Sequence, residues 1–129
     1  MSKLNENRIL IIEDEPVISS VCQQILVKHG FEVDVAGDGQ SAQELIKKQE
    51  YQLLLLDIGI PIMNGIELYD WLQEKYPQLA KRVIFMTGNI MDSDTMSFME
   101  RSGQPYLPKP FSPDELVETV KESLKQIQR

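Results

Sequence analysis

A chain of 129 residues is long enough for one domain with a single core, and 42% hydrophobic with 26% charged residues is typical of a globular protein. The formal net charge of −7 argues against a surface built mainly for nucleic acid, because such surfaces are usually basic. The lone cysteine, Cys22, excludes an internal disulfide and suits a reducing compartment. The sequence has no run of about 18 apolar residues and no signal-peptide core. We therefore expect a cytoplasmic protein, or a cytoplasmic part of a larger one, without a membrane span.

Apolar runs and amphipathic stretches alternate along the chain. Short runs rich in Ile, Val and Leu are typical of strands buried on both faces. They predict strands at residues 8–13, 31–36, 51–57, 82–86 and 105–107. Apolar residues at helical spacing predict helices at residues 16–29, 41–49, 64–75, 92–101 and 112–127.

Two of these helices carry more detailed signals. At the start of the last helix, Ser112 is a favourable N-cap, Pro113 suits the first helical position, and Glu115 completes a capping box. The apolar stripe predicted for the first helix consists of Val17, Ile18, Val21, Cys22, Ile25 and Leu26.

Five strands alternating with five helices predict an α/β fold with a parallel sheet and right-handed crossovers. No repeat, low-complexity segment or linker interrupts the pattern, so residues 1–129 are expected to form one domain. In such sheets, functional residues gather at the carboxyl ends of the strands.

Four of the five predicted strands bring polar side chains to that edge. The first strand ends in Glu13 and Asp14, and the third, after four leucines, ends in Asp57. The fourth is followed by Thr87, and the fifth leads to Lys109. An acid at the mouth of a buried strand is costly unless something offsets its charge, so we expect these side chains to act together.

The predicted cluster suits phosphoryl chemistry. Clustered carboxylates repel one another, and Mg²⁺ relieves this because it prefers oxygen ligands and binds one or two carboxylates together with phosphate. A carboxylate such as Asp57 can be the nucleophile that forms an aspartyl-phosphate. Mg²⁺, Lys109 and Thr87 would then neutralise the phosphoryl oxygens that do not react. The only histidine, His29, ends a predicted helix, and no general base for hydrolysing a separate substrate is evident.

Four stretches in this order, ILIIEDEP, LLLLDIGIPIMNG, VIFMTG and YLPKPF, resemble the receiver domain of two-component response regulators, or the receiver module of a hybrid histidine kinase. The resemblance extends from about residue 8 to residue 127. It implies a flavodoxin-like, doubly wound sheet of order 2-1-3-4-5. It also implies a signalling phosphoacceptor rather than an enzyme, with a histidine kinase or a phosphotransfer histidine as the donor. Phosphorylation would change the conformation and so alter a downstream protein or a linked effector domain.

The resemblance assigns roles to the acidic residues. Asp57 would be the phosphoacceptor and also a Mg²⁺ ligand. Asp14 would bind Mg²⁺ directly, and Glu13 would act through a bound water. The backbone carbonyl of Gly59 would be a further metal ligand.

The resemblance also implies a switch. Thr87 would bind a phosphoryl oxygen and shift on activation, and Tyr106 would swing inward with it. Lys109 would pair with the phosphoryl group, and Pro110 would follow a cis peptide bond that aims the lysine. Family members signal through the face formed by the fourth helix, the fifth strand and the fifth helix, which also implies a surface for homodimer formation.

Three departures from the family pattern stand out. The acidic pair reads Glu-Asp where Asp-Asp is commoner, which lengthens one arm. Ile60 replaces a methionine found before the proline in many members, and we expect little consequence from this apolar swap. The segment SGQPYLPKP, together with FMTG, is more similar to hybrid-kinase receivers than to stand-alone regulators.

Other functions on the same fold fit less well. An FMN-binding flavodoxin would carry a Ser/Thr-rich phosphate loop after the first strand, where this chain has two acids. A P-loop NTPase would carry G-x-x-x-x-G-K-[ST], which is absent from the sequence. The remaining alternative is a module that binds partners without being phosphorylated, and phosphorylation by a small donor would discriminate the two.

Overall fold

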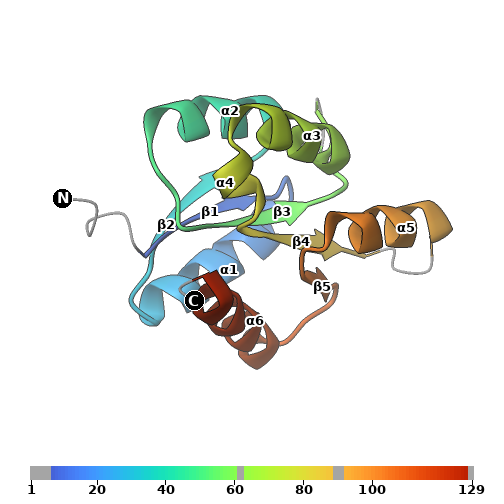
Figure 1. The fold of residues 1–129 in the computed structure, drawn as a ribbon. Helices are drawn as coiled ribbons and strands as arrows, with labels where there is room; N and C mark the ends of the chain where they lie inside the picture. Colours follow the sequence, from blue (N-terminus) through green and yellow to red (C-terminus); the bar gives the residue numbers. More distant parts are fainter. Residues whose placement is uncertain (1–6, 61–62, 89–91, 128–129) are drawn as a thin grey trace.

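The structure is a computed structural model that describes residues 7–60, 63–88 and 92–127. Within these ranges, strands and helices alternate along the chain (Figure 1). In chain order they are β1 (Arg8–Ile12), α1 (Pro16–Lys28), β2 (Glu32–Ala36), α2 (Gly39–Lys48), β3 (Leu53–Asp57), α3 (Gly65–Lys75), α4 (Pro77–Ala80), β4 (Val83–Thr87), α5 (Ser93–Ser102), β5 (Tyr106–Pro108) and α6 (Pro113–Ile127).

The five strands form one parallel sheet in the order β2-β1-β3-β4-β5, which confirms the predicted topology. Helices α2 and α3 cover one face of the sheet, and helices α1 and α6 cover the other (Figure 1). Helix α5 lies beside β4 and β5 and contributes Phe98 and Met99 to the core on the α2/α3 side.

The leucine run of β3 explains why the sheet is buried on both faces. Leu54 and Leu56 point into the core beneath α2 and α3, whereas Leu53 and Leu55 point into the core beneath α1 and α6. All four side chains are fully buried. Because alternate residues of a strand face opposite sides, a strand between two helical layers needs apolar residues at every position.

The five predicted helices are all present, and the structure adds a sixth, short helix that the sequence analysis did not predict. Helix α4 has four residues and lies between α3 and β4. It is too short to show an amphipathic period, and Pro77 at its first position also suits a simple turn.

Caps explain small shifts at the ends of other helices. Helix α5 begins one residue later than predicted because the side chain of Asp92 is its N-cap and accepts from the N–H of Thr95. It ends at Ser102 and is capped by Gly103, whose φ of 71° lies in the left-handed region. The predicted capping box of α6 is confirmed, since Ser112 Oγ accepts from the N–H of Glu115 at 3.1 Å and Glu115 Oε1 accepts from the N–H of Ser112 at 2.7 Å.

The apolar stripe predicted for the first helix is partly wrong. Val17 is 75% exposed and Val21 is 47% exposed, whereas Cys22 and Leu26 are buried as predicted. The six apolar residues span a wider arc of α1 than the sheet and α6 can cover. Val17 and Val21, one turn apart, lie at the uncovered edge of that arc.

The turn that follows β3 is closed by Gly65, whose N–H donates to the carbonyl of Ile58 at 2.8 Å. A Cβ atom on Gly65 would lie 2.6 Å from Ile58 Cα and 2.9 Å from the backbone oxygen of Asp57. A side chain here must therefore displace the backbone that carries Asp57.

We expect Gly65→Ala to lower the free energy of unfolding by about 2 kcal/mol, because the added methyl group meets backbone atoms that cannot move aside freely. Urea denaturation measures the change. Gly37→Ala is the matched control, since a Cβ at Gly37 meets nothing within 4 Å, and its effect should stay within about 0.5 kcal/mol. Equal effects of the two substitutions would contradict the steric argument.

Candidate functional site

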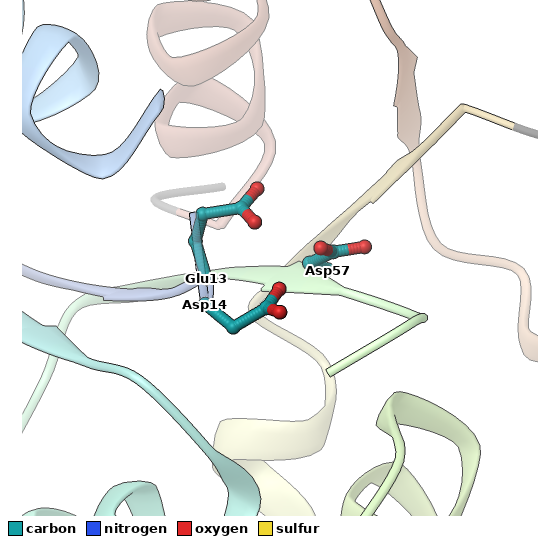
Figure 2. Close-up of side chains that lie close together, drawn as sticks. All are labelled: Glu13, Asp14 and Asp57. Atoms are coloured by element: carbon teal, nitrogen blue, oxygen red, sulfur yellow. The ribbon is translucent and has the colours of Figure 1, made fainter. Parts of the chain in front are cut away.

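Three acids meet where β1 and β3 end side by side. Asp57 is the last residue of β3. Glu13 follows β1, and its N–H donates to the carbonyl of Ala36 on β2 at 3.0 Å. With Asp14, these residues each place a carboxylate oxygen within 4.8 Å of the other two (Figure 2). Such a group of oxygen donors suits a hard divalent cation.

The three acids differ in exposure. Glu13 is 2% exposed and Asp57 is 8% exposed, whereas Asp14 is open to solvent. Each buried carboxylate accepts one backbone N–H: Glu13 Oε2 accepts from Glu15 at 3.2 Å, and Asp57 Oδ1 accepts from Gly59 at 3.0 Å. These bonds fix the two buried carboxylates and leave Asp14 free to meet a cation from the solvent side.

Lys109 supplies the compensating positive charge. Its Nζ lies 2.6 Å from Glu13 Oε1 and 3.2 Å from Asp57 Oδ2. The backbone hydrogen bond from the N–H of Lys109 to the carbonyl of Thr87, at 2.7 Å, holds the lysine beside β4. The Lys109–Pro110 peptide bond is cis. Buried charges are tolerated when they are paired in this way.

Two further residues of interest lie on the neighbouring strands. Thr87 ends β4 at the same edge of the sheet and is 4% exposed. Tyr106 begins β5 opposite Phe85 in the parallel ladder and is 40% exposed. The structure thus brings Glu13, Asp14, Asp57, Thr87 and Lys109 to one rim, with Tyr106 on the outer edge strand.

Burial and charge shape the protonation of this cluster. Burial raises the pKa of Glu13 to about 7, and the carboxylate of Asp57 adds to the rise while Lys109 opposes it. Burial acts to lower the pKa of Lys109, but the hydrogen bonds and charges of Glu13 and Asp57 outweigh it, so that its pKa is raised. Near neutral pH the ammonium is therefore charged, and Glu13 is the acid that a cation would have to deprotonate.

Sequence reasoning missed one residue of the site. Glu15 Oε1 lies 3.7 Å from Lys109 Nζ, so Lys109 faces a third carboxylate in addition to Glu13 and Asp57. A signal existed in the acidic run from Glu13 to Glu15, but sequence alone does not tell on which side of a helix start such an acid points. The contact found for Gly59 is its N–H to Asp57, a different group from the carbonyl that was predicted to bind metal.

An apolar groove borders the site. Its volume is about 420 Å³, and it lies between α1 and the segment after β5. Its lining consists of Val17, Ile18, Val21, Cys22, Lys109, Pro110 and Phe111. The exposed valines of α1 therefore form one wall of a groove that leads to Lys109.

Fold and site together define a class of protein. A doubly wound parallel sheet of this order, with acids, a hydroxyl and an ammonium group at its carboxyl edge, is the arrangement of a phosphoacceptor domain. A family model described as Response regulator receiver domain matches residues 9–121, and the chain belongs to this family.

Curated relatives agree with this assignment. A probable transcriptional regulator, ycf29, of Porphyra purpurea is 38% identical over 114 residues, which are 88% of this chain and 54% of the relative. The transcriptional regulatory protein SrrA of Staphylococcus aureus is 34% identical over 122 residues, which are 95% of this chain and 49% of the relative. The chain thus spans about half the length of these relatives.

Solved structures share the fold over nearly the whole chain. A CheY-like response regulator receiver domain protein from Methanospirillum hungatei is 31% identical with a TM-score of 0.86, and the match covers 95% of this chain and 96% of that one. The receiver domain of a signal transduction histidine kinase from Syntrophus aciditrophicus is 26% identical with a TM-score of 0.85, covering 95% of this chain and 93% of that one. This chain is therefore similar both to a response regulator receiver domain protein and to the receiver domain of a histidine kinase.

Membership of the family establishes the general function. As a receiver domain, the chain is a phosphoacceptor switch of two-component signalling. The acidic triad is suited to the metal ion that such domains use. In the parts of the chain that the structure describes, none of the helices has the length and apolar character needed to cross a membrane.

Proposed function

We propose that Asp57 is the residue that accepts the phosphoryl group, in a reaction that requires Mg²⁺ held by Asp14, Asp57 and the carbonyl of Gly59, with Glu13 acting through a bound water. The observation that supports this most strongly is the set of groups around Asp57. Its carboxylate belongs, with those of Glu13 and Asp14, to a group of oxygens that could hold one cation, and its Oδ2 lies 3.2 Å from Lys109 Nζ.

The transfer follows from this geometry. A carboxylate oxygen of Asp57 attacks the phosphorus of a phosphohistidine, the P–N bond breaks, and its electron pair leaves with the imidazole. The ammonium group of Lys109 and the hydroxyl of Thr87 neutralise phosphoryl oxygens that do not react. Mg²⁺, when bound, supplies the remaining positive charge at the acids. Burial of the carboxylates of Glu13 and Asp57 keeps their interactions in a medium of low dielectric.

The test is incubation with a small phosphodonor and Mg²⁺, followed by mass spectrometry of the intact chain. We expect a mass gain of one phosphoryl group, which is lost when Mg²⁺ is chelated. No gain with any donor would contradict the proposal and favour a module that binds partners without phosphorylation.

Mg²⁺ should stabilise the fold more strongly as the pH rises. The pKa of Glu13 is about 7 in the folded chain against an ordinary value of 4.5, so without metal its contribution to stability is lost as the pH rises through this window. Mg²⁺ binds the deprotonated carboxylates and offsets that loss. In thermal melts, the midpoint should therefore rise more on adding Mg²⁺ at about pH 8 than at about pH 5.5. A pH-independent shift would show that Glu13 does not take part.

Thr87→Ala should separate phosphorylation from the conformational response. The phosphoryl group gains a contact with Thr87 that biases a two-state equilibrium, so its loss should reduce the population of the active form by about tenfold. Hydrogen exchange in α5 and β5, compared before and after phosphorylation, measures this response. Thr119→Ala, on α6, is the control. A normal response in Thr87→Ala would refute the coupling, including the inward turn proposed for Tyr106.

The wider role of the domain is also a proposal. The donor would be a histidine kinase or a histidine phosphotransfer domain. The output would pass through the face of α5, β5 and α6 to a downstream protein, to a linked effector domain or to a second copy, without direct contact to nucleic acid. Residues 1–129 would form one receiver domain, which acts on its own or within a hybrid kinase. The free thiol of Cys22 suits a cytoplasmic setting.

A further inference from the structure

Glu15 occupies an unusual position at the mouth of the site. It is the N-cap residue of α1, where polar side chains often accept an N–H of the first helical turn, but its side chain makes no such bond. Its backbone is fixed at both ends, because its N–H donates to Glu13 Oε2 and its carbonyl accepts from Ser19 at 3.0 Å. The carboxylate is directed instead toward Lys109, at 3.7 Å.

Lys109 is thus shared by three carboxylates of different exposure. The side chain of Glu15 is 62% exposed, whereas those of Glu13 and Asp57 are 0% and 11% exposed. Glu15 is therefore the acid of this group that faces incoming molecules. Its contact with Lys109 keeps its negative charge close to the oxygen of Asp57 that Lys109 also contacts.

We propose that Glu15 is a specificity-determining residue that selects phosphoryl donors by their charge, a role that rests on the phosphoacceptor function proposed for Asp57. Its carboxylate disfavours donors that arrive as dianions relative to donors that carry a positive charge on the leaving group. A phosphohistidine with a protonated or partner-bound imidazole belongs to the second kind. Glu15 also competes with an incoming phosphoryl group for Lys109, because the two contact the same ammonium group.

Two small donors separate these cases. Acetyl phosphate is a dianion near neutral pH: Asp57 attacks phosphorus, the P–O bond breaks, and acetate leaves as an anion with the electron pair. Phosphoramidate is a monoanion whose nitrogen is protonated: the P–N bond breaks, and neutral ammonia leaves with the electron pair. The product on Asp57 is the same, so the ratio of the two initial rates reports only the approach and departure of the donor.

The experiment compares this rate ratio, acetyl phosphate over phosphoramidate, in the wild-type chain and in Glu15→Gln, with Mg²⁺ present. One unit charge at a distance of about 7 Å in a water-like medium changes a rate by about threefold. We expect Glu15→Gln to raise the ratio by about that factor at low ionic strength. The effect should shrink in about 0.5 M salt, because exposed charges are screened.

Two control variants identify the cause. Glu15→Asp keeps the charge at the mouth, and its ratio should stay near the wild-type value. Glu118→Gln removes an exposed acid from α6 and should leave the ratio unchanged. An unchanged ratio in Glu15→Gln, or an equal change for both donors, would overturn the role of Glu15 while leaving Asp57 as acceptor. A wild-type chain that takes no phosphoryl group from either donor would overturn both.

Discussion

Asp57→Asn is expected to abolish phosphorylation, lowering the rate of phosphoryl uptake by at least about a thousandfold. The amide nitrogen has no lone pair available for attack, and the amide oxygen lacks the negative charge that makes the carboxylate a nucleophile. The substitution preserves the size of a side chain that is 8% exposed, so the packing around it should persist. Intact mass after incubation with a small phosphodonor and Mg²⁺ measures the uptake.

Asp70→Asn is the matched control for this prediction. Asp70 is an exposed acid on α3, outside the acidic triad, and its loss should leave the mass gain unchanged. Circular dichroism establishes that both variants are folded. If folded Asp57→Asn still takes up a phosphoryl group, Asp57 is not the phosphoacceptor, and another acid at the rim carries the group.

Lys109→Met should destabilise the fold in a pH-dependent manner. The substitution leaves the fully buried carboxylate of Glu13 without its cation, which costs about 2–4 kcal/mol when that carboxylate is charged. Lys109 acts to lower the pKa of Glu13, so its removal raises this pKa further above 7. The loss should therefore be largest at about pH 8.5 and smaller at about pH 5.5, where Glu13 is protonated in both proteins.

Urea denaturation at the two pH values measures this difference. Lys121→Met, at an exposed position of α6, is the control and should change the free energy of unfolding by less than about 0.5 kcal/mol at either pH. A loss in Lys109→Met that does not depend on pH would mean that Glu13 is not the partner whose charge matters. The apolar stem of methionine keeps the packing, so a cavity would not explain the result.

The sequence allowed the site to be predicted because parallel strands bring their carboxyl ends to one edge. Glu13 and Asp57 are far apart in sequence, but β1 and β3 are neighbours in the sheet and end together. Lys109 was predicted by the same rule, through β5, and the structure places its Nζ against both acids. The positions of the predicted strands and their order in the sheet therefore determined which side chains meet at its carboxyl edge.

Features that depend on local geometry were harder to predict. Helix α4 has four residues, about one turn, and an apolar period cannot repeat within that length. Val17 and Val21 fit the apolar stripe of α1, but which part of the stripe is covered depends on where α6 packs. Glu15 escaped notice because the direction of its side chain depends on Pro16 beginning the helix and on Lys109, which lies far along the chain.

The most direct test of the account is the identity of the residue that carries the phosphoryl group. Borohydride reduces an acyl phosphate on aspartate to homoserine, which peptide mass mapping locates in the sequence. We predict homoserine at position 57 when donor and Mg²⁺ are both present, and none when Mg²⁺ is chelated. Homoserine at Asp14 or at any other acid, or labelling of Asp57 that is indifferent to Mg²⁺, would contradict the proposal that Asp57 accepts the group beside a bound cation.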